Sequence, residues 1–194
     1  MEVTEQVVLL DSSGVAIGVA DKYLVHDDST PLHLAFSCYI FTADRQVLVT
    51  QRSLSKGTFP GVWTNSACGH PAPGESLEGA VRRRTRDELG IGLTDIRLIL
   101  PDFSYVAEMN GIVENEMCPV LMAVIEADAP IATTPLEVED HRWLPWEKLV
   151  DDVRSSIFEV SPWCATQIGI LAELGADPLN WPTGDSALLP ATLR

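Results

Sequence analysis

Short apolar runs separated by polar turns dominate the first part of the chain. Residues 7–10 and 15–20 are mostly apolar and flank the segment Asp11-Ser12-Ser13-Gly14, whose residue types are typical of tight turns. Residues 32–42 are rich in apolar, aromatic and hydroxyl side chains, and residues 47–52 follow after a polar turn. The pattern predicts a strand over each run, with the last two paired as a hairpin.

A helical pattern follows over residues 76–89. Ser76 suits the N-cap position and Gly90 suits the C-terminal stop. Residues 146–152 and 162–174 are the other predicted helices. The apolar side of the first helix comprises Leu77, Ala80, Val81 and Leu89.

The remaining apolar runs predict more strands, over residues 96–100, 103–107, 112–126 and 139–144. Strands and helices follow one another without regular βαβ alternation. We therefore expect an α+β fold, with a mixed β-sheet sandwich flanked by helices. We expect residues 1–175 to form a single domain and the proline-containing residues 176–194 to be an extended or disordered extension.

The charge of the chain argues against one class of partner. Its 194 residues carry a formal net charge of -15, whereas nucleic-acid surfaces need a basic footprint. The same field repels an anionic substrate, so local cations or metal must meet any phosphate ligand. No apolar run approaches the ~18 residues that would span a membrane, and we expect no membrane partner.

The cysteines Cys38, Cys68, Cys118 and Cys164 are scattered and form no C-x-x-C pair. The N-terminus is acidic and lacks the apolar core of a signal peptide. These features favour a reduced, cytoplasmic protein with free thiols.

Imidazole and carboxylate side chains gather in three segments. His26 precedes a loop, His33 begins a predicted strand, and His70 lies in T-N-S-A-C-G-H-P. Glu114 and Glu116 lie two apart on a predicted strand and therefore point to the same face. A bound divalent cation would relieve their repulsion and desolvation, and this mixed donor set suits Mn, Zn or Fe better than Ca. The alternative is that both carboxylates lie on a solvent-facing strand edge.

A second pattern begins in the same segment. Gly69, Glu75 and Arg83 are followed by Asp87-Glu88-Leu89-Gly90-Ile91. This spacing resembles the Nudix box, G-x5-E-x7-R-E-U-x-E-E-x-G-U with U apolar. In that family a loop–helix–loop holds Mg²⁺ with helix carboxylates, and Mg²⁺ usually keeps substrate phosphates in its shell.

The box departs from the family pattern at Arg84, Thr85 and Asp87. Arg84 replaces a carboxylate that a hydrolase uses to hold metal and activate water, which disfavours hydrolysis. Glu88 could still hold one Mg²⁺, and Arg84 could contact phosphate. An amphipathic helix with internal ion pairs would explain the charges but not the register of the glycines and Glu75.

Four segments together resemble the type I, flavin-independent isopentenyl-diphosphate isomerases of the Nudix superfamily. These are T-N-S-A-C-G-H-P, the modified box, G-I-V-E-N-E-M-C and S-P-W. The resemblance implies a Nudix-like fold and interconversion of isopentenyl and dimethylallyl diphosphate, with no flavin. This reaction moves a double bond by protonation and deprotonation, so an acid and a base must flank the C5 unit in a dry pocket.

The resemblance implies four catalytic residues. Cys68 and Glu116 are the acid/base pair on opposite sides of the substrate, and Tyr105 hydrogen-bonds near Glu116. Trp163 would present its π face to the cationic intermediate, although a core aromatic is the alternative for that residue. In the forward direction we expect Glu116, with Tyr105, to donate the proton and Cys68 to accept one.

The resemblance also implies two metal sites. One Mn²⁺ or Zn²⁺ would be held by His26, His33, His70, Glu114 and Glu116. Glu88 would hold a Mg²⁺ that arrives with the diphosphate. We expect a small-molecule diphosphate substrate and favour a monomer. The expected diphosphate contacts are Lys22, Arg52, Lys56 and Arg84.

Two other functions stay open at this point. A Nudix pyrophosphohydrolase acting on a nucleoside diphosphate derivative would explain the box but not the pairing of Cys68 with Glu116. A catalytically inactive metal- or phosphate-binding module would have no need for Cys68 and Trp163 together.

Overall fold

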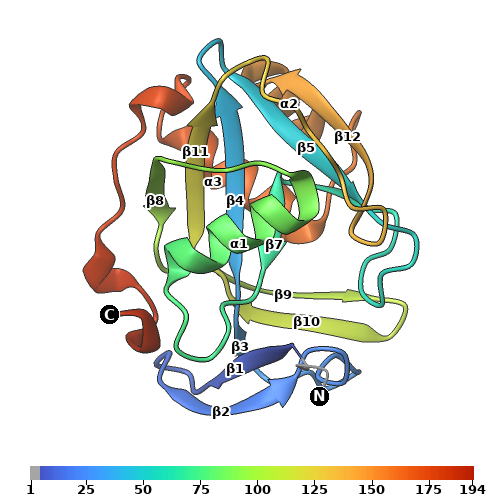
Figure 1. The fold of residues 1–194 in the computed structure, drawn as a ribbon, viewed down its shortest axis with the longest axis vertical. Helices are drawn as coiled ribbons and strands as arrows, with labels where there is room; N and C mark the ends of the chain where they lie inside the picture. Colours follow the sequence, from blue (N-terminus) through green and yellow to red (C-terminus); the bar gives the residue numbers. More distant parts are fainter. Residues whose placement is uncertain (1–4) are drawn as a thin grey trace.

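A seven-stranded sheet forms the centre of the molecule in the computed structural model, which describes residues 5–194. Its order is β12-β5-β4-β11-β8, with β6 paired to β5 and β7 paired to β4. β4 and β11, the central neighbours in Figure 1, are parallel. The strands are β4 (Phe36–Thr42), β5 (Gln46–Arg52), β6 (Trp63–Thr64), β7 (Ala67–Gly69), β8 (Ile96–Leu100), β11 (Val120–Ile125) and β12 (Val138–Pro145).

A five-stranded sheet of order β2-β1-β3-β10-β9 lies below the first in Figure 1. β3 and β10 are parallel, and the remaining pairs are antiparallel. Its strands are β1 (Gln6–Leu10), β2 (Ala16–Asp21), β3 (His33–Leu34), β9 (Ser104–Met109) and β10 (Ile112–Met117).

Two segments that the sequence predicts as long strands each contribute to both sheets. Residues 32–42 divide at Ala35 into β3 and β4, and residues 112–126 divide at Cys118-Pro119 into β10 and β11. The Ala35 amide donates to Met117 O at 2.9 Å, and the Ser37 amide donates to Pro119 O at 3.0 Å. Pro119 has no N–H to donate to a ladder. The prediction of single long strands is therefore wrong. Each segment leaves the five-stranded sheet and enters the seven-stranded sheet at its break.

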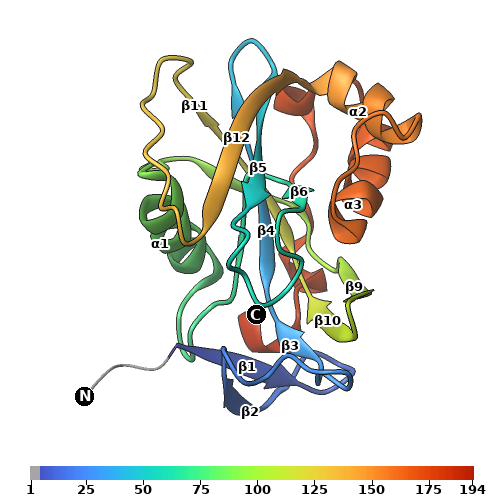
Figure 2. The ribbon, with the colours of Figure 1, turned by 90° about the vertical axis from the view of Figure 1, so that its right-hand side faces the viewer.

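Helices cover the two faces of the central sheet, as Figure 2 shows. On one side α1 (Leu77–Leu89) buries Ala80 and Val81 against β4 and β11 residues. On the other side lie α2 (Trp146–Arg154) and α3 (Pro162–Glu173), whose buried Leu149 and Ile168 belong to a second core cluster. The expected α+β sandwich flanked by helices is confirmed.

The segment 176–194, for which the sequence predicts an extended or disordered course, packs against the rest of the molecule instead. It contains three short 3-10 helices, at Pro178–Asn180, Ser186–Leu188 and Ala191–Leu193. Trp181 is buried and lies edge-on to Trp146, with ring centroids 5.2 Å apart. Burial of one large indole and its neighbours offsets the entropy of ordering a proline-containing segment.

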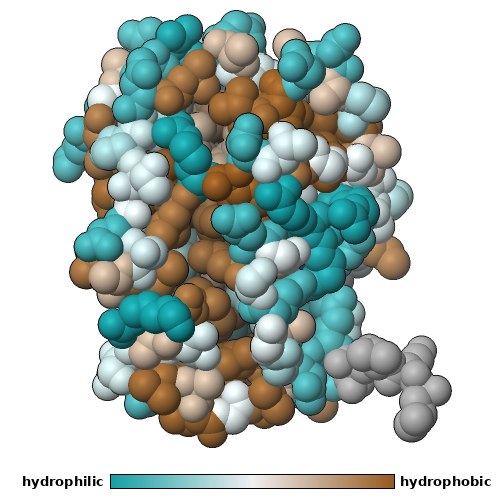
Figure 3. All heavy atoms as spheres, turned by 60° about the vertical axis from the view of Figure 1, so that its left-hand side comes forward, coloured by the Kyte–Doolittle hydropathy of each residue, from teal (hydrophilic) through white to brown (hydrophobic). Residues whose placement is uncertain are grey.

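The surface combines hydrophilic and hydrophobic residues, and Figure 3 shows hydrophobic atoms reaching the surface at the lower end, where β1 and β2 lie. Val15, Ile17 and Val19 of this region are exposed. Within residues 5–194, no helix combines the length and apolar character needed to cross a bilayer.

Candidate active site

Strand register brings His33, Tyr105 and Glu116 side by side. His33 of β3 is the partner of Glu116 across the parallel pair with β10, and Tyr105 of β9 is its partner on the other side. Glu114 and Glu116 are both buried, because alternate residues of β10 face the same way. The alternative of a solvent-facing edge for the two carboxylates is wrong.

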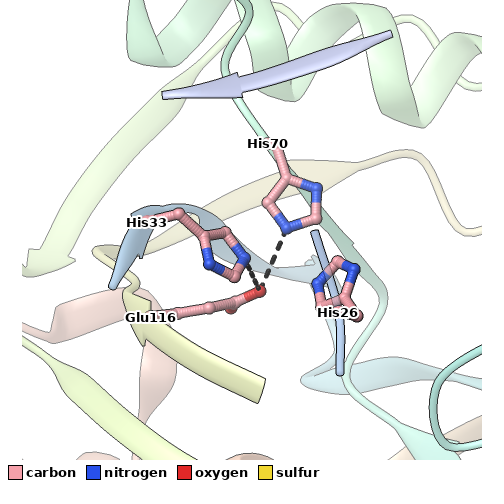
Figure 4. A group of neighbouring side chains, drawn as sticks. All are labelled: His26, His33, His70 and Glu116. Carbon is pink, nitrogen blue, oxygen red and sulfur yellow. Dashed lines mark hydrogen bonds and ion pairs between the residues drawn. The ribbon is translucent and has the colours of Figure 1, made fainter. Parts of the chain in front are cut away.

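Three imidazoles converge on Glu116, as Figure 4 shows. One candidate ligand atom from each of His26, His33, His70 and Glu116 lies within 4.8 Å of the others. Glu116 Oε1 lies 3.0 Å from His70 Nε2 and 3.4 Å from His33 Nε2. Glu114 adjoins the group, with its Oε2 3.4 Å from His26 Nε2. The structure thus brings together all five residues that the sequence proposes as ligands.

Backbone carbonyls orient two of these rings. His33 Nδ1 lies 2.9 Å from Pro31 O, and His26 Nδ1 lies 3.3 Å from Lys22 O. Because a carbonyl only accepts, each Nδ1 carries the hydrogen, and the neutral ring keeps a lone pair on Nε2. Carbonyl partners of this kind are typical of metal-ligating histidines.

The donor set fits a transition metal. His26 Nε2, His33 Nε2 and His70 Nδ1 are buried without a hydrogen-bond partner among residues 5–194. A lone pair of His33 that faces a carboxylate oxygen of Glu116 is repelled unless a proton or cation lies between them. Buried polar atoms without partners are rare, and a divalent cation would use His26 Nε2 and His33 Nε2, together with His70 Nε2, the nitrogen that faces Glu116.

Glu116 is held in its ionised form. Burial would raise the pKa of its carboxyl group, but the neighbouring His33 and His70 rings outweigh burial and hold that pKa well below its usual range. The Tyr105 hydroxyl donates to Glu116 Oε2 at 2.8 Å. Burial and the charge of Glu116 raise the pKa of Tyr105 well above its usual range. A phenol proton therefore lies beside the carboxylate.

β7 carries Cys68 to the same region. Cys68 lies opposite Ser37 of β4, and Gly69 lies opposite Phe36. A Cβ on Gly69 would lie 2.8 Å from Arg84 Cγ, so glycine allows α1 to approach β7. Burial raises the pKa of the Cys68 thiol, although the hydroxyl of Ser37 acts in the opposite direction.

One cavity of about 480 Å³ joins these groups. Of the proposed site residues, His33 and Glu88 do not line it. Cys68 and Glu116 both face the cavity, so a ligand could meet both. The other proposed site residues in the lining are Lys22, His26, Arg52, Lys56, His70, Arg84, Tyr105, Glu114 and Trp163.

Trp163 forms an aromatic wall of the cavity. It is buried at the start of α3, stacks on Tyr105 at 5.2 Å between centroids, and meets Phe59 edge-on. The Arg52 guanidinium carbon lies 5.7 Å from the centroid of Trp163, a distance at which indole attracts cations. The ring is thus both a core aromatic and a cavity wall.

The Nudix-like box folds as a loop followed by α1. Arg83 donates to both carboxylate oxygens of Glu75, at 2.9 and 2.8 Å, and to His70 O at 3.1 Å. This bidentate pair ties the start of the box to the middle of the helix. Arg84 is buried and hydrogen-bonded to Glu88 one turn along.

Carboxylates engage three of the four expected diphosphate contacts. Lys22 Nζ lies 2.5 Å from Glu5 Oε2, and Lys56 contacts Glu137. Arg84 is shared between Glu88 and Glu137, with the latter at 3.2 Å.

Arg52 differs from the other three contacts, because it donates to the carbonyls of Thr58 and Phe59 and so anchors the loop after β5.

Sequence reasoning did not identify Glu5 and Glu137 as parts of the site. Both are far in sequence from the cations that they contact, and no motif marks them. Glu137 is held by the backbone: the Ser53 amide donates to its carbonyl, and its own amide donates to Thr134 O.

Comparisons with known proteins bear on the family of this chain. The NUDIX domain family matches residues 31–164. An isopentenyl-diphosphate Delta-isomerase of Saccharopolyspora erythraea is 51% identical over 96% of this chain and 95% of its own length. Another, from Mycolicibacterium vanbaalenii, is 50% identical over 90% and 95%. This chain belongs to the isopentenyl-diphosphate Delta-isomerase family.

Solved structures show the same fold. A crystal structure of DR0079 from Deinococcus radiodurans has a TM-score of 0.66 and 18% identity, over 86% of this chain and 98% of that one. A MutT protein from Methanosarcina mazei has a TM-score of 0.58, 19% identity and coverage of 74% and 94%. At such identities the likeness concerns the fold alone. Within the isopentenyl-diphosphate Delta-isomerase family the Nudix fold is the scaffold, and the residues in the cavity decide the chemistry.

Proposed function

We propose that this chain interconverts isopentenyl diphosphate and dimethylallyl diphosphate and so supplies isoprenoid precursors. The observation that carries the proposal is that one cavity is lined by a thiol, a carboxylate and a group of cations, as this reaction requires. The cavity volume of about 480 Å³ is adequate for a C5 diphosphate.

In the forward direction Glu116, with Tyr105, donates a proton to the alkene, and the thiolate of Cys68 removes a proton from the adjacent carbon. The electron pair of the broken C–H bond forms the new double bond. This leaves Glu116 ionised and Cys68 as a thiol. The hydrogen bonds of the two groups, with Tyr105 donating to Glu116 and Cys68 donating to Asn65, match the state that forward turnover produces.

Trp163 stabilises the positive charge that develops between the two steps. Its ring lies in the lining and already has Arg52 within cation–π range. The apolar walls made by Trp163 and Tyr105 also exclude water, which would otherwise capture a tertiary cation.

Metals complete the site in this proposal. His26, His33, His70, Glu114 and Glu116 hold one Mn²⁺ or Zn²⁺, and Glu88 holds a Mg²⁺ that accompanies the diphosphate. When bound, these cations supply positive charge that fixes the carboxylates and offsets the charge of the substrate.

Lys22, Arg52, Lys56 and Arg84 bind the diphosphate. Because Glu5, Glu88 and Glu137 engage three of these cations, the ion pairs must rearrange when substrate and Mg²⁺ arrive. The chain's free cysteines support a cytoplasmic location. We further propose that the enzyme works as a monomer without flavin, and that residues 1–175 form the isomerase domain to which residues 176–194 are an extension.

The test is to incubate the protein with isopentenyl diphosphate and Mg²⁺ in D₂O and follow the products by proton NMR. Dimethylallyl diphosphate that carries deuterium is the expected product. Released phosphate without an allylic product would overturn the proposal and favour a Nudix pyrophosphohydrolase, and binding without any product would favour an inactive module.

A further inference from the structure

A chain of hydrogen-bonded polar side chains lies behind Cys68 in the protein interior. Ser37, Asn65 and Gln167 are fully buried. Polar groups in such a place lower stability unless each has a partner. Here Asn65 and Ser37 contact the Cys68 sulfur, and Gln167 donates to Ser37. None of these three residues lines the cavity, so they act on a ligand through Cys68.

The amide of Asn65 has a fixed orientation. Its Nδ2 donates to Ala67 O at 2.8 Å and to Cys38 O at 3.2 Å. Because both partners only accept, the nitrogen must face them, and Oδ1 must face the other way. Oδ1 accepts from Cys68 Sγ at 3.0 Å and from Thr64 Oγ1 at 3.0 Å. Asn65 thus presents an acceptor, and only an acceptor, to the thiol.

A hydroxyl lies on another side of the sulfur. Ser37 Oγ is 3.6 Å from Cys68 Sγ and 3.4 Å from Cys118 Sγ. Gln167 Nε2 donates to Ser37 Oγ at 3.0 Å, and Tyr39 donates to Gln167 Oε1 at 2.9 Å. When Ser37 Oγ accepts from Gln167, its own hydrogen is free for a sulfur acceptor. The network therefore joins α3 to β4 and then to Cys68.

We propose that Asn65, supported by Ser37, is the positioning residue for Cys68. In the thiol form, which forward turnover produces from the thiolate, Asn65 holds the S–H hydrogen on the protein side of the sulfur and away from the cavity. The inference rests on the proposed function for its catalytic consequence, but its structural content, a hydrogen bond from Cys68 to Asn65, can be measured without substrate.

This arrangement has a direct consequence for turnover. The proton that the sulfur takes from the C5 skeleton turns toward Asn65 and away from the new double bond. Without the amide oxygen the thiol rotates freely, and proton transfer depends on sub-ångström placement of the reacting atoms. Binding of the diphosphate, which involves other side chains, is unaffected.

The hydrogen bond is tested by Raman spectroscopy of the S–H stretch at neutral pH. Subtracting the spectrum of Cys68→Ala from that of the unaltered protein isolates the Cys68 band. We expect this band at lower wavenumber than that of a free thiol and expect it to move up in Asn65→Ala, because hydrogen bonding weakens the S–H bond. A band at the free-thiol position, or no Cys68 band, would overturn the inference whatever the protein catalyses.

The kinetic test compares matched variants. Ser37→Ala and Asn65→Ala should lower kcat by about 10- to 100-fold while KM changes less than about threefold. Ser66→Ala is the control for Ser37→Ala: Ser66 is also fully buried and bonds Ile40 N and Leu48 O, but it does not contact Cys68. Thr50→Val is the control for Asn65→Ala, since Thr50 Oγ1 donates to the backbone of Asn65 only.

The controls should lose stability but keep kcat. Equal losses of kcat in Ser37→Ala and Ser66→Ala would overturn the positioning role and indicate a purely structural network. If Asn65→Ala fails to fold, the comparison of Ser37→Ala with Ser66→Ala and the Raman band of the unaltered protein still test the inference. Absence of isomerase activity in the unaltered protein would overturn the proposed function, while the Raman result would separately decide the hydrogen bond.

Discussion

Cys68 and Glu116 line one cavity but lie in opposite chemical surroundings. The thiol has neutral partners, and its burial raises its pKa. The carboxylate lies among imidazoles that hold its pKa low. Two titratable groups whose surroundings push their pKa values apart are typical of an acid/base pair. The side chains that create these surroundings come from several strands.

Replacing Cys68 should separate chemistry from folding. Cys68→Ala is expected to lower kcat by at least about 10²- to 10⁴-fold, the usual contribution of a positioned acid or base. The metal content and circular dichroism spectrum should not change. Cys38→Ala makes the same substitution at a fully buried cysteine outside the cavity lining and should keep kcat. A Cys68→Ala protein with ordinary turnover would remove this thiol from the mechanism.

Replacing Glu114 tests the extent of the metal site. Glu114→Gln keeps the shape of the side chain but removes a charge beside His26, so the bound transition metal should fall by about 10-fold or more at a fixed free-metal concentration. Elemental analysis of the purified protein measures this. Glu108→Gln, at an exposed position of β9, is the control. Equal metal contents in the two variants would show that Glu114 is not a ligand.

At the scale of elements, α1 is the best-defined unit because its two ends are fixed. The Ser76 hydroxyl accepts from Gly79 N at 3.1 Å, and Gly90 ends the helix in the left-handed region with φ 70°. The Gly90 amide donates to Arg86 O, as in an αL helix ending, and the next amide donates to Thr85 O. Fixed ends keep Arg83 in place to bind Glu75, and they keep Arg84, which lines the cavity, beside Glu88.

Gly90→Ala should therefore destabilise the protein by about 1–2 kcal/mol, since a left-handed conformation disfavours a side chain by that amount. The new Cβ would also lie 2.9 Å from Ala132 Cβ. Gly92→Ala is the matched control, because a Cβ at Gly92 would meet nothing within 4 Å and the φ of Gly92 is not positive. Denaturant unfolding gives both free energies. Equal values for the two variants would contradict the assignment of strain to Gly90.

At the scale of the whole molecule, the C-terminal extension contributes Trp181 and Leu189 to the core. Arg97 of β8 donates to Trp181 O at 2.9 Å, and the Trp181 indole donates to Gly175 O at 2.9 Å. At the beginning of the segment, Arg45 and Asp177 form a bidentate pair at 2.9 and 2.7 Å. The segment therefore contributes Trp181 to the core cluster that contains Trp146 and Leu189 to the cluster that contains Ala80 and Val81.

Trp181→Ala should lower the free energy of unfolding by about 3–5 kcal/mol, the usual loss for removing a buried large aromatic. Trp181 is 2% exposed and packs against Trp146 and Phe41. Leu188→Ala, at a residue that is 54% exposed in the same segment, should cost little. Denaturant unfolding of the two variants would measure both free-energy losses. A small loss at Trp181 would mean that the segment contributes little to the core.

The local sequence pattern predicts an element correctly where the interactions that form the element lie within a few residues of one another. The strands of the first hairpin, the helix over 77–89 and its caps follow from apolar spacing and from Ser76 and Gly90. Alternation on β10 placed Glu114 and Glu116 on one buried face. The strand break at Pro119 was missed, because a long apolar run does not show which sheet each half joins.

The sequence by itself determined the chemistry available to this protein: the thiol, the imidazoles, the carboxylates and the box that leads into α1, because these depend on residue type and short spacing. Only the tertiary structure decided which of them meet. It placed His33 beside Glu116 through a parallel strand pair, Asn65 behind Cys68, and Glu137 on Lys56 and Arg84. Contacts between residues far apart in sequence depend on strand register and packing, which no local pattern encodes.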